Sequence, residues 1–416
     1  MKTFVFCIDA LFSRDLETLR NHPSFAPLFS HAVAVKNMEA VYPTLTYPTH
    51  VSIVSGVTPS IHRVIANQPL DPATENRDWF WYYRQSKAKT IFDGLHENGL
   101  STCAVFWPVT AAGPIDYLVP EIWSADNLAI VKENSSHNID DILDEHKELL
   151  TFSDKLQQDT YGCLCTEDII RRYNPDVVFV HFCLIDHTRH VCGIDHPDIQ
   201  RDLNIMGDLF GRMMDAVHDV QKDEPNVVIL GDHGHLDYTT NLLPNTVFEK
   251  KGWVKRDKPE DFLVYCHGCG ISAHVYLKDP TLAPQIEALF NEWKRDGYLL
   301  EYYNRFQAAE MGLDGTFTYV LEAADGFSII SQFGDNFAEP LTLPKGVKGF
   351  GNHGHLPNRG NKPPFMVSSP IISGYTEVEK GNMLDIAPTL CRMHNVVPWS
   401  MQGSAIEQIA HYYQEK

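Results

Sequence analysis

The sequence has little of what membrane-spanning and nucleic-acid-binding proteins need. None of its apolar runs is long enough to span a bilayer, and the chain has 416 residues. Positive charge is scarce, because 34 Lys and Arg stand against 54 Asp and Glu, which gives a formal net charge of -20. An acidic surface repels nucleic-acid backbones, so a nucleic-acid polymer is not an expected partner. A small anionic substrate stays compatible with this charge, because bound metal ions can reverse the field locally.

The cysteines do not form the pattern of a disulfide scaffold. There are nine, an odd number, and they are scattered along the chain without dense spacing. The apolar stretch at the N-terminus meets a carboxylate at Asp9, which makes it too short for a signal peptide. We therefore expect a reducing, cytoplasmic location. Cys266–Cys269 is a lone CxxC without two further ligands nearby, so we interpret it as two reduced cysteines.

Three continuous apolar runs each lead into an aspartate. They are Thr3–Ile8, Asp176–Ile185 and Asn226–Leu230, followed by Asp9, Asp186 and Asp232 in turn. Runs of this kind are typical of buried parallel strands, and the helix-like stretches Leu143–Leu156 and Asp198–Gln221 lie between them. The alternation predicts a three-layer α/β/α core. Ligands of such sheets bind at the carboxyl ends of the strands, where these carboxylates stand.

Residues 238–345 have a different pattern from the rest of the chain. Ile271–Leu277 and Phe317–Glu322 resemble half-buried strands, and Pro284–Asp296 resembles an amphipathic helix. This segment predicts a small α+β cap inserted into a metal-binding catalytic core of residues 1–237 and 346–416. The stretch Gln68–Glu133 is rich in Trp, Tyr and Pro, and we expect it to form ordered loops on the substrate side.

Aspartates and histidines recur in patterns typical of metal ligands. Asp186 and His190 are four residues apart and would share one face of a helix, while Asp232 and His233 form a pair on a glycine-flanked turn. Together with Asp9 and His353 they provide three carboxylates and three imidazoles, which is enough for two divalent ions. Taken singly, each pattern is more often a turn, a helix cap or a solvated helix face. Spacing alone leaves further candidates open: His187, Asp195, His196, His235 and His355.

A candidate nucleophile lies in the threonine-rich segment Tyr42–His50, before the helix-like start Val51–Ser55. A hydroxyl at a helix N-terminus lies in a field that favours an oxyanion, and a bound metal would lower its pKa further. The local alternative is an N-cap threonine in a proline-rich turn. Nothing local separates Thr44, Thr46 and Thr49.

Read in order, these motifs resemble the nucleotide pyrophosphatase/phosphodiesterase family of the alkaline phosphatase superfamily. The matching segments are Thr46-Tyr47-Pro48-Thr49-His50, Val54-Ser55-Gly56-Val57, Asn67, Phe106-Trp107-Pro108, Asp186-x-x-x-His190, Gly231-Asp232-His233-Gly234, His353-Gly354 and Asp385–Leu390. They cover roughly residues 1–236 and 346–406. The resemblance implies an alkaline phosphatase-like core, with a cap that matches only in position and general character.

The resemblance also implies a role for each matching residue. Thr46 would be the nucleophile, and the metal that activates it would be bound by Asp9, Asp232 and His233. The second metal would be bound by Asp186, His190 and His353. Asn67 would donate a hydrogen bond to a phosphate oxygen, and Tyr47 and Trp107 would line the substrate site. The ions are expected to be zinc. A packing role in the loop is an equal alternative for Tyr47. The family often has Gly where Arg63 and Arg189 stand, which bears on substrate preference.

The predicted function is a two-metal phosphodiesterase or nucleotide pyrophosphatase that acts on a small phosphate ester through a covalent phospho-threonine. One alternative is a C–P hydrolase like phosphonoacetate hydrolase, which would need Lys or Arg groups to hold a carboxylate. Another is a non-catalytic protein that keeps the metal ligands. The sequence gives no signal for an oligomeric state.

Overall fold

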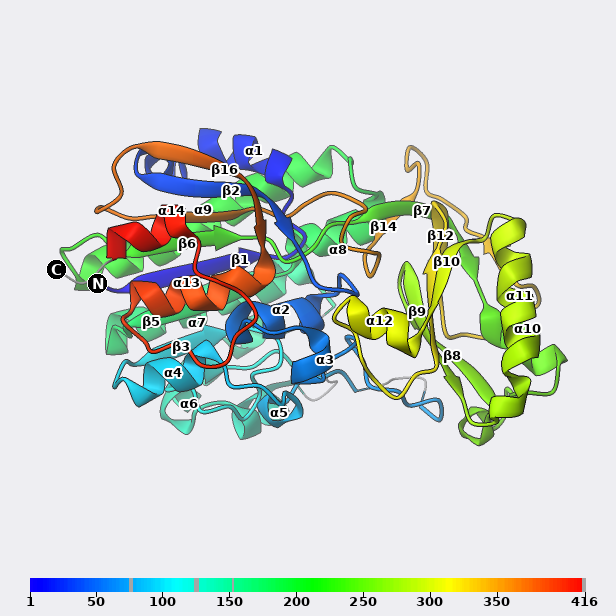
Figure 1. Ribbon diagram of the computed structural model, residues 1–416. Coiled ribbons are helices and arrows are strands. Elements are labelled where there is room, and N and C mark those ends of the chain that lie inside the picture. The colour runs from blue at the N-terminus through cyan, green and yellow to red at the C-terminus, as the bar shows by residue number, and fades with distance from the viewer. Residues whose placement is uncertain (75–77, 123–126, 152, 414–416) are drawn as a thin grey trace.

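The computed structural model describes all residues except 75–77, 123–126, 152 and 414–416, and it is built around an eight-stranded sheet (Figure 1). In spatial order the strands are β16 (Tyr375–Asn382), β2 (Ala32–Glu39), β15 (Phe365–Ser368), β6 (Asn226–Leu230), β1 (Thr3–Ile8), β5 (Val177–Phe182), β3 (Thr102–Val105) and β4 (Tyr117–Val119). β15 is antiparallel to both of its neighbours, and the other neighbouring pairs are parallel.

The central strand β1 is buried on both faces. Its side chains alternate between two hydrophobic clusters: Phe4, Phe6 and Ile8 belong to one, and Val5 and Cys7 to the other. This double burial explains why β1 is a continuous apolar run.

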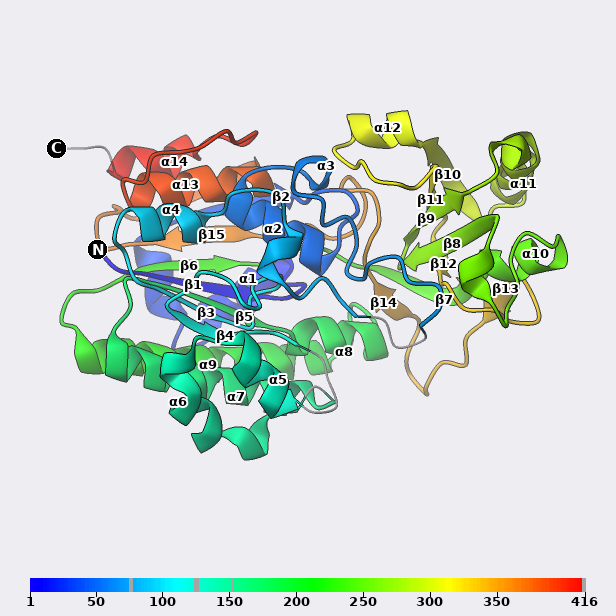
Figure 2. The same ribbon diagram turned by 90° about the horizontal axis from the view of Figure 1, so that it is seen from below.

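Helices cover both faces of the sheet and form the outer two layers (Figure 2). One face carries α1 (Leu16–Asn21), α7 (Lys155–Tyr173) and α9 (Asp198–Val220), and the other carries α2 (Thr46–Ser55), α4 (Ile91–Glu97), α13 (Ile386–Met393) and α14 (Glu407–Ala410). The predicted three-layer α/β/α core is therefore confirmed. β1, β6 and α9 lie where the sequence predicts them, within one residue at each end.

Two predicted elements are wrong in extent. The run Asp176–Ile185 is strand only over β5, and Leu184 already begins the helix α8 (Leu184–Cys192). Leu184 and Ile185 are apolar because they face the core from the first turn of this helix. The predicted helix Leu143–Leu156 is instead the end of α6 (Asp140–Glu145), a short 3-10 turn and the start of α7, and residue 152 lies outside the described residues. α7 begins after Asp154, whose carboxylate accepts a hydrogen bond from the Gln157 backbone N–H at 3.0 Å.

The stretch Gln68–Glu133 contains more regular structure than the predicted loops. It supplies β3, β4 and α4 to the main sheet and its cover, and most of α5 (Asn127–Asn134). Residues 75–77 and 123–126 of this stretch lie outside the described residues. β3 and β4 have only four and three residues, which is too short for a periodic pattern to identify them.

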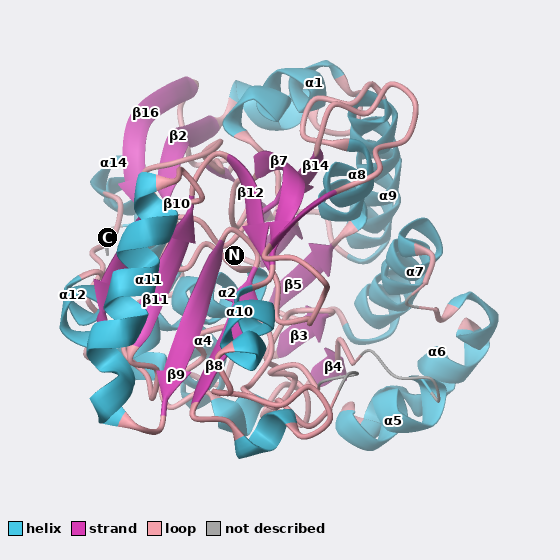
Figure 3. Cartoon of the chain, turned by 90° about the vertical axis from the view of Figure 1, so that its right-hand side faces the viewer, coloured by secondary structure: helices cyan, strands magenta, loops and turns pink. Residues whose placement is uncertain are grey.

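A second unit with its own apolar core lies beside the carboxyl end of the main sheet (Figure 1). Its antiparallel sheet has the order β10 (Leu299–Asn304), β11 (Tyr319–Ala323), β9 (Ser272–Leu277) and β8 (Val264–Cys269). Helix α11 (Ala283–Arg295) lies across this sheet, with α10 (Pro244–Lys250) and α12 (Arg305–Glu310) at its sides (Figure 3). Strands β9 and β11 and helix α11 correspond to the elements that the sequence predicts for the cap.

A small third sheet joins the two units. In it, β7 (Leu236–Leu242) pairs with β12 (Gly326–Ile329), β13 (Ala338–Pro340) and β14 (Phe350–Asn352). This sheet crosses both predicted domain boundaries, because β7 starts before residue 238 and β14 lies after residue 345. It fixes the end of the loop between β6 and β7 and the start of the loop between β14 and β15.

The nine cysteines are all free thiols, and eight of them are buried. Within the part of the chain that the structure describes, the helices lack the combined length and apolar character that crossing a membrane requires.

Candidate metal centre

The carboxyl ends of three adjacent strands bring the predicted carboxylates together. Asp9 follows β1, Asp232 follows β6, and Asp186 lies in the first turn of α8 after β5. His233 Nε2 is 3.3 Å from Asp9 Oδ1 and 3.3 Å from Asp232 Oδ2. The backbone N–H of Ala10 donates to Asp232 Oδ1 at 3.0 Å and fixes that carboxylate.

A second group forms around Asp186. Its members are Asp186, His190, His235 and His353, whose ligand atoms all lie within 4.8 Å of one another. Helix α8 places Asp186 and His190 on one face, with Oδ2 and Nε2 3.3 Å apart. His235 Nε2 lies 2.8 Å from Asp186 Oδ1, and His353 Nε2 lies 4.0 Å from the same oxygen. Asp186 also groups with Asp9 and His233, so the two sets adjoin.

The hydrogen bonding of His190 fits a metal ligand. Its Nδ1 lies 2.8 Å from the carbonyl oxygen of Gly351, which can only accept, so Nδ1 carries the hydrogen. In a neutral ring, Nε2 then has a lone pair directed at Asp186 Oδ2, which is also an acceptor. A proton on Nε2 removes the conflict, and against the effect of burial the charge of Asp186 raises the pKa of His190. A metal ion could take the place of that proton, and a backbone carbonyl on the far ring nitrogen is the usual partner of a metal-binding histidine.

Two carboxylate oxygens of the first group are left unsatisfied. Asp9 Oδ1 and Asp232 Oδ2 are buried and accept no hydrogen bond. Burial, followed by the charges of Asp186 and Asp232, raises the pKa of Asp9 well above its usual value. Buried carboxylate oxygens without donors are costly unless a cation compensates them. The oxygen and imidazole set therefore fits two divalent ions of the zinc type.

Two histidines of the second group are held in the neutral form that a metal ligand needs. Burial, opposed by Asp186, lowers the pKa of His235 to about 3. Burial and the neighbouring His233 and His190 lower the pKa of His353 well below its usual value. Neutral imidazole has a free lone pair, so these rings are ready to bind a cation without first losing a proton.

Of the three candidate threonines, the structure brings Thr46 to this cluster. Thr46 is the first residue of α2, and its Oγ1 lies 3.0 Å from His233 Nε2. Thr44 donates its hydroxyl hydrogen to the His355 carbonyl oxygen at 3.0 Å. Thr49 is fully buried, and its hydroxyl has no hydrogen-bond partner.

A cavity of about 160 Å³ opens beside the cluster and is lined by Asn67 and His353. The side-chain carbonyl of Asn67 accepts the backbone N–H of Tyr47 at 3.0 Å, which leaves the amide NH₂ to donate to a ligand. The cap contributes Gly268 and Cys269 to the opposite wall. Part of the CxxC that we interpret as two reduced cysteines thus lies in the wall of this cavity, and neither cysteine forms a disulfide.

The predicted substrate contacts of Tyr47 and Trp107 are not what the structure shows. Tyr47 is 1% exposed, and its hydroxyl donates to Glu121 at 3.0 Å, so it packs the wall of the site. Trp107 is fully buried and packs edge-on against His50 and Phe179 in the core. Among the described residues, Trp79 lines the cavity and packs on the Tyr47 ring, although it stands in none of the sequence motifs.

The alternative metal ligands separate once distances are known. His235 joins the second group, whereas Asp195 pairs with Arg14 at 2.5 Å on the surface. His196 groups with Cys192 and Asp198, which are only half-buried. His355 has both ring nitrogens near backbone carbonyl oxygens, and His187 belongs to neither of the two groups.

Two further histidines support the first group and were missed. His181, in β5, lies 3.2 Å from Asp9 Oδ2, and His50, in α2, lies 3.5 Å from Asp232 Oδ2. The polar residue inside the apolar run of β5 was the available signal for His181. His50 ends the matching segment that starts at Thr46, but its position beside Asp232 depends on where α2 lies relative to β6.

Arg63 and Arg189 do not bring positive charge to the cavity. Arg189 is fully buried and pairs with Asp15 at 2.7 Å. Arg63 pairs with Asp314 of the cap at 2.9 Å.

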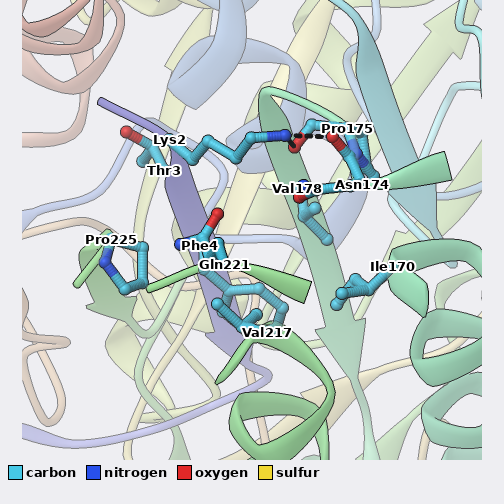
Figure 4. A pocket seen from close by; sticks show the side chains of 10 residues that line it. All are labelled: Lys2, Thr3, Phe4, Ile170, Asn174, Pro175, Val178, Val217, Gln221 and Pro225. Carbon is cyan, nitrogen blue, oxygen red and sulfur yellow. Dashed lines mark hydrogen bonds between the residues drawn. The ribbon is translucent and has the colours of Figure 1, made fainter. Parts of the chain in front are cut away.

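A second cavity, at the opposite end of the sheet, is too small for a substrate. It measures about 20 Å³, enough for roughly one water molecule, and lies among Phe4, Val178 and Val217 (Figure 4). Lys2 reaches across its rim to the carbonyl oxygens of Asn174 and Pro175.

Comparison with known proteins identifies the family. The sequence profile of the type I phosphodiesterase / nucleotide pyrophosphatase family matches residues 3–355, which is most of the chain. The chain belongs to this family. It is therefore a member of the alkaline phosphatase superfamily, as the sequence motifs predict. The match runs through the first core segment and the cap, and it ends at residue 355, shortly after the second core segment begins.

Relatives within the family are distant in sequence. Ectonucleotide pyrophosphatase/phosphodiesterase family member 1 of Rattus norvegicus is 24% identical over 243 residues, which are 56% of this chain and 24% of that protein. The chain thus spans about a quarter of the length of that relative. A protein of Homo sapiens named bis(5'-adenosyl)-triphosphatase is 21% identical over 402 residues, which are 93% of this chain and 77% of that protein.

Solved structures of the family share the fold. Murine ectonucleotide pyrophosphatase/phosphodiesterase 5 superposes with a TM-score of 0.68 at 17% identity, covering 97% of this chain and 98% of that chain. The human counterpart gives the same TM-score and covers 97% of each chain. The predicted alkaline phosphatase-like fold is confirmed.

Proposed function

We propose that this protein is a phosphoric diester hydrolase of the nucleotide pyrophosphatase type, with Thr46 as its nucleophile. The observation that carries the proposal is the position of Thr46. Its hydroxyl lies 3.0 Å from His233 Nε2, next to two adjoining sets of metal ligands and at the N-terminus of α2. Positive field from the helix and from cations favours both an ionised hydroxyl and a phosphate ester at this point.

The residues divide into two ligand sets and one donor. One ion, beside Thr46, would be held by Asp9, Asp232 and His233. The other would be held by Asp186, His190 and His353. Both ions are expected to be zinc. When bound, such ions lower the pKa of the nucleophile and stabilise charge on the attacking and leaving oxygens. Asn67 would donate its amide N–H to a non-bridging phosphate oxygen.

The reaction is a double displacement at phosphorus. Thr46 Oγ1 gives its proton to solvent and forms a bond to phosphorus, while the bond from phosphorus to the leaving oxygen breaks and that oxygen takes up a proton from solvent. The enzyme then holds a phosphoryl or nucleotidyl group on Thr46. Water adds to that phosphorus, the bond to Thr46 breaks, and the threonine hydroxyl takes back a proton.

The structure gives less support to a C–P hydrolase that recognises a carboxylate. That alternative needs Lys or Arg at the substrate, and neither residue type is among the described residues that line the 160 Å³ cavity. Arg63 and Arg189, the two arginines that the sequence analysis singled out, are bound to Asp314 and Asp15.

A pair of matched variants tests the nucleophile. Thr46→Val removes the hydroxyl but keeps the side-chain shape, and we expect it to lower turnover of bis(p-nitrophenyl) phosphate by at least about 10³-fold in zinc-loaded protein. Thr49→Val makes the same change one turn further along α2, at a hydroxyl without a hydrogen-bond partner, and should keep activity within a few-fold. Equal activities of the two variants would refute Thr46 as the nucleophile.

The same protein should be assayed on a panel of phosphorus compounds. The panel holds bis(p-nitrophenyl) phosphate, p-nitrophenyl phosphate, phosphonoacetate and diadenosine triphosphate, the last because of the activity named for the human relative. Faster turnover of a diester or of the dinucleotide supports the proposal. Preference for phosphonoacetate favours the C–P hydrolase, and absence of turnover with zinc bound favours a non-catalytic metal-binding protein.

A further inference from the structure

His235 occupies a position in the metal centre that the family resemblance does not assign. It lies two residues after His233 in the extended loop between β6 and β7. Residues two apart in extended chain point to the same side, and the two rings stack with centroids 5.5 Å apart. His233 therefore joins the ligand set of Asp9 and Asp232, whereas His235 reaches the set around Asp186.

His235 lies beside Asp186, as the candidate ligands His190 and His353 do. The residue is fully buried, with Nε2 2.8 Å from Asp186 Oδ1. Its ring centroid lies 4.8 Å from that of His190 and 5.3 Å from that of His353. Three imidazoles thus converge on one carboxylate.

The backbone at Gly351 is shaped to accept this ring. A Cβ atom at Gly351 would lie 2.7 Å from His235 Nδ1 and 2.7 Å from the Arg189 carbonyl oxygen. Only glycine lets β14 approach the ring and α8 this closely. The same residue accepts the His190 N–H through its carbonyl oxygen, so one strand positions both rings.

We propose that His235 is a fourth protein ligand of the second metal site, together with Asp186, His190 and His353. The inference rests on the metal-dependent function proposed above. One carboxylate and three imidazoles are ligands that zinc accepts, and a substrate oxygen would then enter as a fifth ligand, a coordination number that catalytic zinc can reach. The first set has two carboxylates, one imidazole and the Thr46 hydroxyl, and oxygen-rich sets are less selective for zinc. The second site therefore binds zinc first and more tightly.

His235 could instead act as a positioning residue that donates Nε2–H to Asp186. His235→Gln separates the two roles, because glutamine keeps a hydrogen-bond donor but has no imidazole lone pair. Loss of a residue that merely orients a ligand costs roughly 10–100-fold in metal affinity. Loss of a ligand should cost more.

The test is a zinc titration of chelator-stripped full-length protein against a chromophoric chelator, with bound zinc counted by mass spectrometry. We expect two ions per wild-type chain. In H235Q we expect one site to weaken by more than about 100-fold, with the other site unchanged. A loss of about 100-fold or less at that site overturns the proposal.

His355→Gln is the matched control. This histidine is also buried and lies on the loop after β14, but its Nδ1 is 2.8 Å and its Nε2 3.3 Å from backbone carbonyl oxygens. It belongs to neither group of candidate metal ligands, so H355Q should keep both zinc affinities. Weakening of zinc binding in H355Q equal to that in H235Q would also overturn the proposal.

Zinc-soaked crystals of the wild-type protein decide the matter if H235Q fails to fold. The anomalous zinc peak should lie about 2.0–2.1 Å from His235 Nε2. A peak bonded to Asp186, His190 and His353 but not to His235 overturns the proposal. Because every readout here is zinc binding, a protein that binds zinc through His235 but hydrolyses no ester fails the proposed function alone.

Discussion

At the scale of single residues, the Asn67 amide is held by one hydrogen bond that fixes which end of it is available. The Tyr47 backbone N–H occupies its carbonyl oxygen, so a phosphate ester in the cavity meets the NH₂ group. A donor placed in this way stabilises charge on a non-bridging oxygen as it grows in the transition state.

Asn67→Ala should therefore lower kcat for the diester by about 10²–10³-fold, the usual cost of losing one such donor. Steady-state kinetics on zinc-loaded protein measures this effect. Gln68→Ala alters a neighbouring residue of the same cavity wall and should change kcat by only a few-fold. Equal kcat losses in the two variants would argue against a specific role for the Asn67 amide.

Residue identity alone did not reveal which aromatic side chains meet the cavity. Tyr47 and Trp107 stand in motif segments, yet both are 1% exposed or less. Trp79 stands in a segment with no motif and lines the cavity. Burial depends on what packs from distant parts of the chain, and a sequence motif carries no information about that packing.

At the scale of secondary structure, α8 is tied to the loop after β1 by a buried arginine. Arg189 donates to the Ala10 carbonyl oxygen at 2.8 Å and to Asp15 at 2.7 Å, and its guanidinium lies 3.4 Å from the Phe12 ring centroid. The loop carries Asp9 and the helix carries Asp186. This contact therefore fixes the distance between the two ligand sets.

Arg189→Met should destabilise the fold by roughly 3–5 kcal/mol, because it leaves Asp15 buried without its counter-ion. Adding Asp15→Asn should recover part of this loss. Urea unfolding of the metal-free proteins measures both free energies. Arg172→Met is the control: Arg172 pairs with Asp141 and Glu145 on the surface, and its loss should cost about 1 kcal/mol or less. A similar cost for R172M and R189M would contradict the argument.

Strand and helix boundaries near the site were harder to predict than the elements themselves. The apolar residues Leu184 and Ile185 continue the pattern of β5, although they belong to the first turn of α8. A short apolar run fits a buried strand and a buried helical turn equally well. The hydrogen bonds that end β5 and begin α8 exist only once the sheet has formed.

At the scale of the whole molecule, both units contain a neutral histidine buried away from the metal ligands. His62 in α3 (Pro59–His62) hydrogen-bonds the Ser52 hydroxyl at 2.9 Å, and His274 in β9 stacks on Phe317. Burial lowers the pKa of each to about 3, against about 6.5 in an unfolded chain. The unfolded chain therefore binds more protons than the folded protein between these two values.

Because these folded-state pKa values are depressed, the contribution of the two histidines to stability is complete above pH 6.5 and is lost as the pH falls towards 3. Each histidine should lower the free energy of unfolding by about 2 kcal/mol at pH 5 relative to pH 7.5. His274→Phe keeps an aromatic ring against Phe317 and should reduce the pH dependence of the unfolding free energy of metal-free protein. His218→Gln, an exposed position, should keep the wild-type dependence. The same pH dependence in H274F and wild type would contradict the prediction.

The sequence by itself determined the elements that local patterns encode. β1 and β6 are apolar along their whole length because helices cover them on both faces, and α9 and α11 show the helical period because one face of each packs inward. It also determined that aspartates follow the central strands. The ordered motifs then indicated the family, which the profile match confirms.

Only the tertiary structure decided which residues meet. β3 and β4 are too short to carry a pattern, and the choice of Thr46 over Thr44 and Thr49 depends on a histidine 187 residues away. His235 joins the second ligand set because β14 approaches it from the far side of the cap insertion. Metal ligands must converge within a few ångströms, and that convergence depends on strand order and loop position, which a linear pattern does not encode.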